Sequence, residues 1–305
     1  MNLPTTRPQV KPAEREVPRV VVVGGGVAGL ILATRLGHLL GHRGLARVSL
    51  IDRSWIHVWK PMLHTFAAGT WNLYEQQVQY VAHARTHHFE YIPGQLDAID
   101  RAARRIRLAP SQMAGETIAG ARELGYDVLI LAFGSRANDF STPGVVEHCH
   151  FIDSPDQADA FNAQMRAHVV RSFEQGGNID IAIVGGGATG VELAAELCRM
   201  VELAAGYGEA DIRRRLRLTL LESAPHILNA FPELSASAAS QLRAFGTPGR
   251  FGFFKGAFIK GRFAQLSHAL LYRGHQVSLH GPSRAALLWL AERINALVQP
   301  NIRIS

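Results

Sequence analysis

One glycine-rich segment of this 305-residue chain has the spacing that binds a phosphate-containing ligand, Gly24-x-Gly26-x-x-Gly29. In such a turn the first glycine permits a tight bend and the second lets the backbone approach a pyrophosphate. The third lets a helix pack closely on a strand, and the amides at the start of that helix face the phosphate charge. Asp52 follows 23 residues after Gly29, at the distance where a carboxylate accepts a hydrogen bond from a ribose hydroxyl.

The same arrangement occurs a second time as Gly185-x-Gly187-x-x-Gly190, and the acid that follows it is Glu222. Ser and Ala come directly after Glu222, where a ribose 2′-phosphate would need an arginine. An acid in this setting favours an unphosphorylated ribose, and therefore NADH over NADPH. Two such turns predict two dinucleotides, and the economical chemistry for such a pair is hydride transfer from a nicotinamide to a flavin.

The sequence pattern also predicts the strands and helices that must position these residues. A buried strand precedes the first turn and another strand precedes the second; an apolar-patterned helix follows each turn, and a further strand ends at each acid. A glycine pattern alone is weak evidence for dinucleotide binding, but with a strand before it, a helix after it and an acid at the right distance the evidence is strong. We therefore predict an α/β fold with two Rossmann-like dinucleotide-binding units. The predicted elements are residues 20–23, 30–36 and 47–51 around the first turn, and 179–184, 191–201 and 216–221 around the second.

Further elements follow from local patterns. The alternating segments 90–92, 98–100 and 105–108 predict strands of a small antiparallel insert. Residues 126–132 predict another buried parallel strand, and its carboxyl end could meet a ligand. We expect 53–64 to be an aromatic-rich loop and 78–88 to be helical. The histidines here lack a spaced set of acids or cysteines, so we expect no metal site. We interpret His57 and His64 as hydrogen-bonding loop residues, and His83, His87 and His88 as a solvated face.

Composition limits the class of protein. Hydrophobic residues make up 47% and charged residues 19% of the chain, as in soluble globular proteins, and no apolar run is long enough to span a membrane. Cys149 and Cys198 are far apart, which excludes a disulfide framework and a local redox pair. The proline-rich residues 1–18 lack the apolar core of a signal peptide, so we expect a disordered tail on a cytoplasmic protein.

Charge is concentrated at the C-terminal end. Residues 249–305 hold eight Lys or Arg against the single acid Glu292, whereas the rest of the chain is balanced. Apolar residues recur at helical spacing through 284–298. This helix could dock on the protein body, but apolar residues with basic flanks better fit an interfacial helix on anionic lipid. Nucleic acid is a poor alternative, because no binding motif accompanies the charge.

Thr189 and Glu192 have two interpretations. Thr-x-x-Glu is the pattern of a capping box, which satisfies the free amides at a helix start. Alternatively, the Glu192 carboxylate lies at the mouth of the nicotinamide site as a proton or hydrogen-bond partner. Spacing alone does not separate the two, and they are compatible.

With these motifs in view, the chain resembles type II NADH dehydrogenase, the single-subunit, non-proton-pumping NADH:quinone oxidoreductase. The resemblance covers about 19–245 and 251–305. It is carried by the motifs His57-Val-Trp-Lys-Pro-Met-Leu-His64, Tyr126-Asp-Val-Leu-Ile-Leu-Ala-Phe-Gly-Ser135, Gly185-Gly-Gly-Ala-Thr-Gly-Val-Glu192 and Leu271-Tyr-Arg-Gly-His-Gln-Val-Ser-Leu-His-Gly281.

The resemblance implies that NADH passes a hydride to FAD and that electrons continue to a membrane quinone, with Glu192 at the junction. It implies FAD binding by Gly24, Gly26, Gly29, Asp52, Arg53, Lys60, Ala132, Gly134 and Ser135, and NADH binding by Gly185, Gly187, Gly190 and Glu222. The domains expected are an FAD-binding part (19–145), an NADH-binding part (146–248) and a membrane-anchoring segment (249–305). We expect peripheral attachment to the cytoplasmic face of the inner (plasma) membrane, and a homodimer is possible.

The chain departs from the family after about residue 245. In the family, an apolar strand ending in Gly-Asp returns to the flavin domain, and an Ala-Gln helix then lines the quinone site. This chain has no Gly-Asp dipeptide, and 246–250 lead directly into the C-terminal segment. We therefore expect incomplete units, weak FAD retention and impaired or absent turnover. The alternatives are an NADH:acceptor flavoreductase without quinone specificity and a non-enzymatic, membrane-associated nucleotide-binding remnant.

Overall fold

The computed structural model describes residues 17–71, 77–113, 116–206, 212–229, 235, 236, 238–240, 242 and 272–298. Within the chain, two compact units form. Unit 1 comprises Met1–Trp55 and Gln79–Phe133, and unit 2 comprises Ile56–Val78 and Gly134–Ser305. The expectations for the N-terminal tail up to residue 16, for the joint 246–250 and for the aromatic stretch 251–271 lie outside the described residues.

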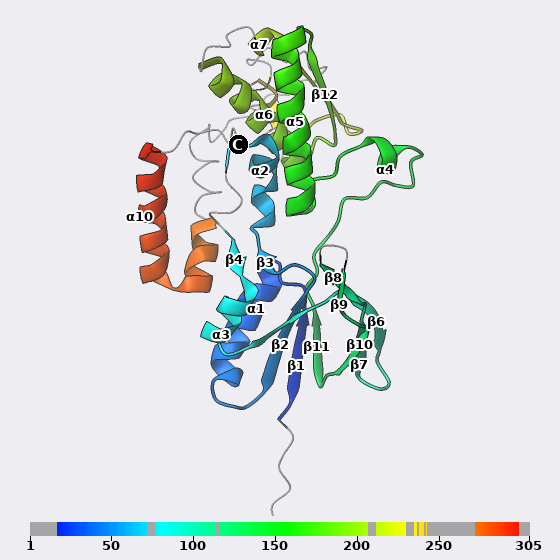
Figure 1. Ribbon diagram of the computed structural model, residues 1–305, viewed down its shortest axis with the longest axis vertical. Coiled ribbons are helices and arrows are strands. Elements are labelled where there is room, and N and C mark those ends of the chain that lie inside the picture. Colours follow the sequence, from blue (N-terminus) through cyan, green and yellow to red (C-terminus); the bar gives the residue numbers. More distant parts are fainter. Residues whose placement is uncertain are drawn as a thin grey trace, which may run out of the picture. The chain divides into compact units, whose positions relative to one another are not determined.

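Unit 1 is built on a parallel sheet with the order β11-β1-β2-β5 (Figure 1). Four consecutive valines form most of β1 and are all buried, because β-branched side chains suit a strand that is covered on both faces. The helical and parallel-sheet elements are β1 (Arg19–Val23), α1 (Val27–Leu36), the π-helix η1 (Gly37–Gly41), β2 (Arg47–Asp52), α3 (Tyr80–Thr86), β5 (Glu90–Pro93) and β11 (Val128–Leu131).

Antiparallel strands complete unit 1. They form a sheet with the order β10-β7-β6 and a separate hairpin, β8-β9. Ile106 and Leu108 of β7 pack with Val21, Val23 and Ile51, so the antiparallel sheet covers one face of the parallel one. These strands are β6 (Leu96–Asp100), β7 (Arg105–Leu108), β8 (Ser111–Met113), β9 (Glu116–Ala119) and β10 (Arg122–Gly125).

Unit 2 has a larger core. A two-stranded parallel sheet, β12-β13, packs with α6, and α2 packs against α5 and α6. Its elements are β3 (Ile56–His57), the 3₁₀ helix η2 (Lys60–Met62), α2 (Leu63–Ala68), α4 (Val145–His148), α5 (Pro155–Gln175), β12 (Ile179–Val184), α6 (Ala188–Gly206), α7 (Ile212–Arg215), β13 (Leu216–Leu221), a helix at 272–280 and α10 (Pro282–Val298). The two-residue strand β4 (Val78–Gln79) lies where the chain passes from one unit to the other.

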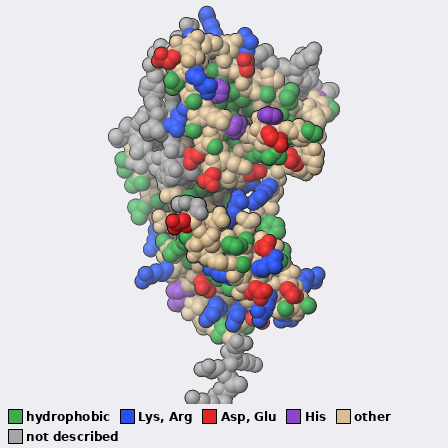
Figure 2. Space-filling model, turned by 45° about the vertical axis from the view of Figure 1, so that its right-hand side comes forward, with side chains coloured by type: hydrophobic (Ala, Val, Ile, Leu, Met, Phe, Trp, Pro, Cys, Tyr) green, Lys and Arg blue, Asp and Glu red, His purple; other side chains and the backbone are tan. Residues whose placement is uncertain are grey.

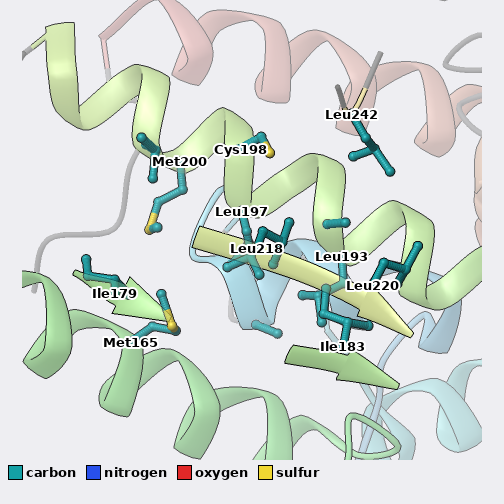
Figure 3. Packing of buried hydrophobic residues seen from close by; sticks show 14 of the residues in the cluster. Met165, Ile179, Ile183, Leu193, Leu197, Cys198, Met200, Leu218, Leu220 and Leu242 are labelled. Carbon is teal, nitrogen blue, oxygen red and sulfur yellow. The ribbon is translucent and has the colours of Figure 1, made fainter. Parts of the chain in front are cut away.

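Figure 3 shows how the core of unit 2 is packed. Leu193 and Leu197 point from α6 onto Leu218 and Leu220 of β13, and Ile183 of β12 lies beside them. All five side chains are at least nine-tenths buried. This apolar layer holds the β12–α6 turn, which carries the second glycine pattern.

Four local predictions are wrong. The strand expected at 126–132 is parallel but not buried, because Val128 and Leu131 of β11 are 49% and 48% exposed. Residues 90–92 belong to β5, which pairs in parallel with β2 and not with the antiparallel insert. The expected loop 53–64 includes the helix η2 and the start of the helix α2. All six residues of α2 are buried. His83 is buried, at 5% exposed, and does not lie on a solvated face, because its Nε2 is 2.8 Å from Thr34 Oγ1.

No helix in the described part of the chain is long and apolar enough to cross a membrane.

Candidate functional site

The first glycine turn has the backbone geometry of a phosphate-binding site. Gly24 adopts φ +104°, a conformation that favours glycine, and an added Cβ would lie 2.5 Å from the Ala132 carbonyl oxygen. A Cβ on Gly29 would lie 1.8 Å from the Gly24 carbonyl oxygen, so helix and turn pack as closely as glycine allows. By contrast, a Cβ on Gly26 would meet no atom of the described residues within 4 Å. The backbone at Gly26 is therefore open to a ligand.

Asp52 closes this turn from the end of β2. Its Oδ2 accepts a hydrogen bond from the Gly25 amide at 2.6 Å, and its Oδ1 accepts one from the Ser54 amide at 2.8 Å. A carboxylate has about four acceptor positions, so further lone pairs remain for a ribose hydroxyl. The Tyr80 hydroxyl donates to the Gly25 carbonyl at 2.6 Å. The sequence assigned Tyr80 no role at this turn, because the residue lies on α3, far along the chain.

The second turn repeats this geometry. Gly185 has φ +106°, and a Cβ on Gly190 would lie 2.0 Å from the Gly185 carbonyl oxygen. A Cβ on Gly187 again meets nothing within 4 Å among the described residues. The Glu222 Oε2 accepts from the Gly186 amide at 2.6 Å, and its Oε1 accepts from the Ala224 amide at 2.9 Å. Hydrogen bonds from these two amides, Ala224 first, lower the pKa of Glu222 below its usual value.

Backbone hydrogen bonds are duplicated as well. The Gly24 amide donates to the Ile51 carbonyl at 2.7 Å, and the Gly185 amide donates to the Leu221 carbonyl at 2.8 Å. Each first glycine is thus tied to the last apolar residue before the acid. This explains why the acid reaches the middle glycine amide in both turns. The chain therefore contains two sites that fit a dinucleotide pyrophosphate and ribose.

Glu192 lies on the first turns of α6. Its Oε2 is 3.4 Å from Nδ1 of the buried His64 on α2. Burial, and next the charge of Glu196, raise the pKa of Glu192 to about 6. A carboxyl group with this pKa exchanges a proton near neutral pH, so it could serve a reaction that consumes or releases protons.

The capping-box interpretation of Thr189 and Glu192 is wrong. The Val191 amide donates to the Gly187 carbonyl at 3.1 Å, so the helix begins after Gly187 and Thr189 lies inside it. The threonine is therefore not the capping residue, and the Glu192 carboxylate lies beside His64. No sequence signal linked these two residues, which are far apart along the chain.

The remaining predicted site residues fall in both units. Ala132 donates its amide to the Val23 carbonyl at 2.7 Å, beside the first turn, and Arg53 is exposed directly after Asp52. In unit 2, Lys60 Nζ donates to the Ser135 carbonyl at 2.8 Å and pairs with Asp153 Oδ1 at 2.9 Å. Gly134 has φ +70° in the same segment. Lys60 and Ser135 are thus brought together as a pair.

The comparisons with known proteins agree with this geometry. The model of the "Pyridine nucleotide-disulphide oxidoreductase" family matches residues 18–252. The chain belongs to this family. The α/β fold with Rossmann-like units is therefore confirmed, whereas the membrane-associating character of the C-terminal segment stays a prediction.

Within this family, the chain is 38% identical over 248 residues to the type II NADH:quinone oxidoreductase of Haemophilus influenzae, covering 75% of this chain and 56% of that protein. It is 37% identical over 141 residues to external alternative NAD(P)H-ubiquinone oxidoreductase B1 of Solanum tuberosum, covering 41% of this chain and 23% of that protein. The predicted similarity to type II NADH dehydrogenase is confirmed. The chain spans little more than half the length of the first of these relatives and less of the second.

Solved structures show the same fold. NDH2 from Plasmodium falciparum, in complex with NADH, matches with a TM-score of 0.66 at 18% identity, covering 77% of this chain and 48% of that one. The sulfide:quinone oxidoreductase of Aquifex aeolicus matches with a TM-score of 0.60 at 18% identity, covering 79% of this chain and 52% of that one.

Proposed function

We propose that this chain binds FAD at the first glycine turn and NADH at the second, and that it acts as an NADH:quinone oxidoreductase. The observation that carries the proposal is the duplicated turn: in each copy the second glycine of the pattern has open space beside it, and the acid accepts a hydrogen bond from the amide of the residue just before that glycine. The relative from Haemophilus influenzae supports the reaction type, because its name describes NADH:quinone oxidoreductase activity.

Each turn offers backbone amides for the pyrophosphate of a dinucleotide and a carboxylate for one of its riboses. Bound FAD would supply the chemistry of accepting a hydride and passing on electrons. Gly26 and the start of α1 present backbone amides to a pyrophosphate, and Asp52 accepts from the ribose. In the second site, Gly187 and the start of α6 do the same for NADH. The carboxylate of Glu222 would repel a ribose 2′-phosphate, which supports NADH over NADPH.

Glu192 is proposed as the group that exchanges a proton in this reaction. Its pKa of about 6 means that both protonation states are populated near neutral pH. His64 Nδ1 lies 3.4 Å from the carboxylate and, when the imidazole is protonated, would stabilise the ionised form of Glu192. The pair can therefore hold a proton and release it without a large change of structure.

The C-terminal hairpin, formed by the helix 272–280 and α10, is proposed to contact the membrane that contains the quinone. Glu292 on the inner face of α10 pairs with Arg273, and Gln276 Nε2 donates to Glu292 Oε1 at 3.4 Å. On the outer face, side chains at helical spacing are exposed: Leu287 at 66%, Leu290 at 50% and Ile294 at 53%. An apolar stripe that faces away from the hairpin partner supports lipid contact better than docking on the protein body. We propose peripheral attachment on the cytoplasmic face.

The cofactor assignment can be tested with alanine substitutions whose added methyl group would clash with a bound ligand but not with the protein. Gly26 has φ −63° and free space around a Cβ, so Gly26→Ala should fold normally and yet push a methyl group into the pyrophosphate position. We expect wild-type protein reconstituted with FAD to show a flavin absorption band that bleaches with NADH, and Gly26→Ala treated in the same way to show much less of the band. Gly120→Ala, also in unit 1 with free space around a Cβ, is the matched control.

The second site is tested in the same way. Gly187→Ala should retain the flavin but weaken bleaching by NADH, whereas Gly274→Ala in the helix 272–280 should not. Retention of the band in Gly26→Ala, or full bleaching in Gly187→Ala, would refute the assignment of that turn. Turnover with a water-soluble acceptor but not with quinone in membranes would exclude the quinone reaction.

Membrane contact is tested by sedimentation with anionic liposomes at low salt. Replacing Leu287, Leu290 and Ile294 together by serine should leave the protein in the supernatant. Serine at the exposed Leu39, Val81 and Ile118 of unit 1 is the matched control. Equal sedimentation of both variants would rule out the C-terminal hairpin as the anchor.

A further inference from the structure

Unit 1 contains a cluster of histidines that the proposed function does not use. His38 and His42 come from η1 and the residue after it, and His83, His87 and His88 come from α3 and the turn that follows. These are all the histidines of unit 1, so the purple side chains in the lower part of Figure 2 belong to this cluster. They come from segments about fifty residues apart, so only the fold brings them together.

Glycines set the register of this cluster. A Cβ on Gly37 would lie 2.1 Å from the His87 carbonyl oxygen, and one on Gly41 would lie 2.1 Å from the His88 carbonyl oxygen. The repeat Gly-His-x-x-Gly-His at 37–42 therefore packs against the two consecutive histidines, His87 and His88. Each glycine allows backbone contact, and the histidine after it meets a partner ring. π-helices such as η1 are rare and often mark functional sites.

The central contact joins two imidazole nitrogens. His38 Nε2 lies 2.7 Å from His87 Nδ1, with the two rings nearly perpendicular at 86°. His83 also packs against the His87 ring, with the centroids 4.1 Å apart and the ring planes tilted by 38°. Because His83 is buried and bonded to Thr34, it holds the His87 ring from inside the protein. One nitrogen of the pair is therefore rigidly supported, and His38 is exposed.

We propose that His38 Nε2 and His87 Nδ1 form a binding site for a divalent transition metal of the Cu²⁺ class. A shift of one ring to its other tautomer leaves a lone pair on both nitrogens without loss of a proton. Adjacent ligands of a tetragonal Cu²⁺ ion, at bonds of about 2.0 Å, stand about 2.8 Å apart, close to the 2.7 Å of the hydrogen-bonded pair. To bind the ion, the rings must turn so that both lone pairs point at the metal and no longer along the line between the two nitrogens. Two ligands of a tetrahedral Zn²⁺ ion would have to separate to about 3.3 Å.

The surroundings favour a cation. η1 continues directly from α1, so the site lies at the C-terminal end of this helix, where the helix dipole is negative. The glycine turn proposed for the anionic pyrophosphate lies at the opposite end of α1. No group of three or more His, Cys, Asp or Glu side chains among the described residues could hold a metal ion. The pair would thus supply two ligands, and water would complete the coordination.

The test uses the untagged full chain titrated with CuCl₂ in a non-coordinating buffer, followed by calorimetry and by electron paramagnetic resonance. We expect one tight equivalent of Cu²⁺ with a tetragonal spectrum and hyperfine coupling to two nitrogens. Zn²⁺ should bind at least tenfold more weakly. His38→Ala should weaken Cu²⁺ binding at least tenfold and remove one nitrogen coupling, and His87→Ala should do the same.

The controls decide whether this pair is the ligand set. His168→Ala removes an exposed histidine on α5 and should change nothing. Because His38 is exposed, His38→Ala should fold even if His87→Ala does not. Unchanged binding in His38→Ala, equal weakening in His168→Ala, or loss only in His42→Ala would each overturn the proposal.

Discussion

The buried contact between His57 and His275 should make the docking of the C-terminal hairpin depend on pH. His57 is 2% and His275 5% exposed, and their Nε2 atoms are 2.9 Å apart. The Trp59 ring covers His275, with the centroids 4.3 Å apart. Among the described residues, His275 Nδ1 has no hydrogen-bond partner. A proton added there would be buried without an acceptor, so the docked hairpin requires a neutral His275.

The size of the effect follows from the pKa. Burial, and next the charges of His57 and His280, lower the pKa of His275 to about 3 from its ordinary value of 6.5. Below pH 6.5 the detached segment takes up a proton that the docked segment does not. Docking is therefore at full strength above the unfolded pKa and weakens as pH falls. At pH 5.0 the loss is about 2 kcal/mol, a factor of about 30 in the opening equilibrium.

Hydrogen exchange measured by mass spectrometry at pH 7.5 and pH 5.0, corrected for the intrinsic rate, tests this. Peptides covering 57–71 and 272–280 should open about 30-fold more at pH 5.0, whereas peptides from α5 should not change. His275→Gln should abolish the pH dependence, whatever it does to the docking itself. His168→Gln, on the exposed face of α5, should keep it.

Two results would refute the reasoning. One is equal opening at both pH values in the wild-type protein, which would mean that His275 is solvated or already protonated. The other is an undiminished pH effect in His275→Gln, which would mean that other groups titrate.

Four further substitutions probe the sites and the core. Glu192→Gln should remove an inflection near pH 6 from the pH profile of flavin bleaching by NADH. Glu222→Gln should weaken NADH binding five- to tenfold, or about 1 kcal/mol, by fluorescence titration, because a neutral amide replaces a charged acceptor. Tyr80→Phe should cost about 1–3 kcal/mol in urea unfolding, since it removes the donor to the buried Gly25 carbonyl. Leu197→Ala, at a fully buried position, should cost about 2–5 kcal/mol in the same assay.

Each of these has a contrary outcome. An inflection near pH 6 that survives in Glu192→Gln would assign it to another group. NADPH binding weakened as much as NADH binding in Glu222→Gln would point to a collapsed turn. Losses below about 0.5 kcal/mol in Tyr80→Phe or Leu197→Ala would mean that these side chains are not held as described.

The sequence by itself determined the two glycine turns, the strands and helices around them, and the acids that close them. These features are local: a bend that needs φ above zero, a close approach that only glycine permits, and a carboxylate at the end of the next strand. The positive φ of Gly24 and Gly185 and the close approaches at Gly29 and Gly190 follow from such rules, so they could be predicted, as could the similarity to type II NADH dehydrogenase.

Only the tertiary structure decided where the segment Ile56–Val78 belongs. It leaves unit 1 and buries Leu63 and Phe66 in the core of unit 2. The α2 helix within it has six residues, too few for a helical period to be distinguished from an apolar loop. The pairs His64–Glu192, His57–His275 and His38–His87 were equally hidden. Each joins residues between 49 and 218 positions apart, so the folding of distant elements, not local spacing, brings the two side chains into contact.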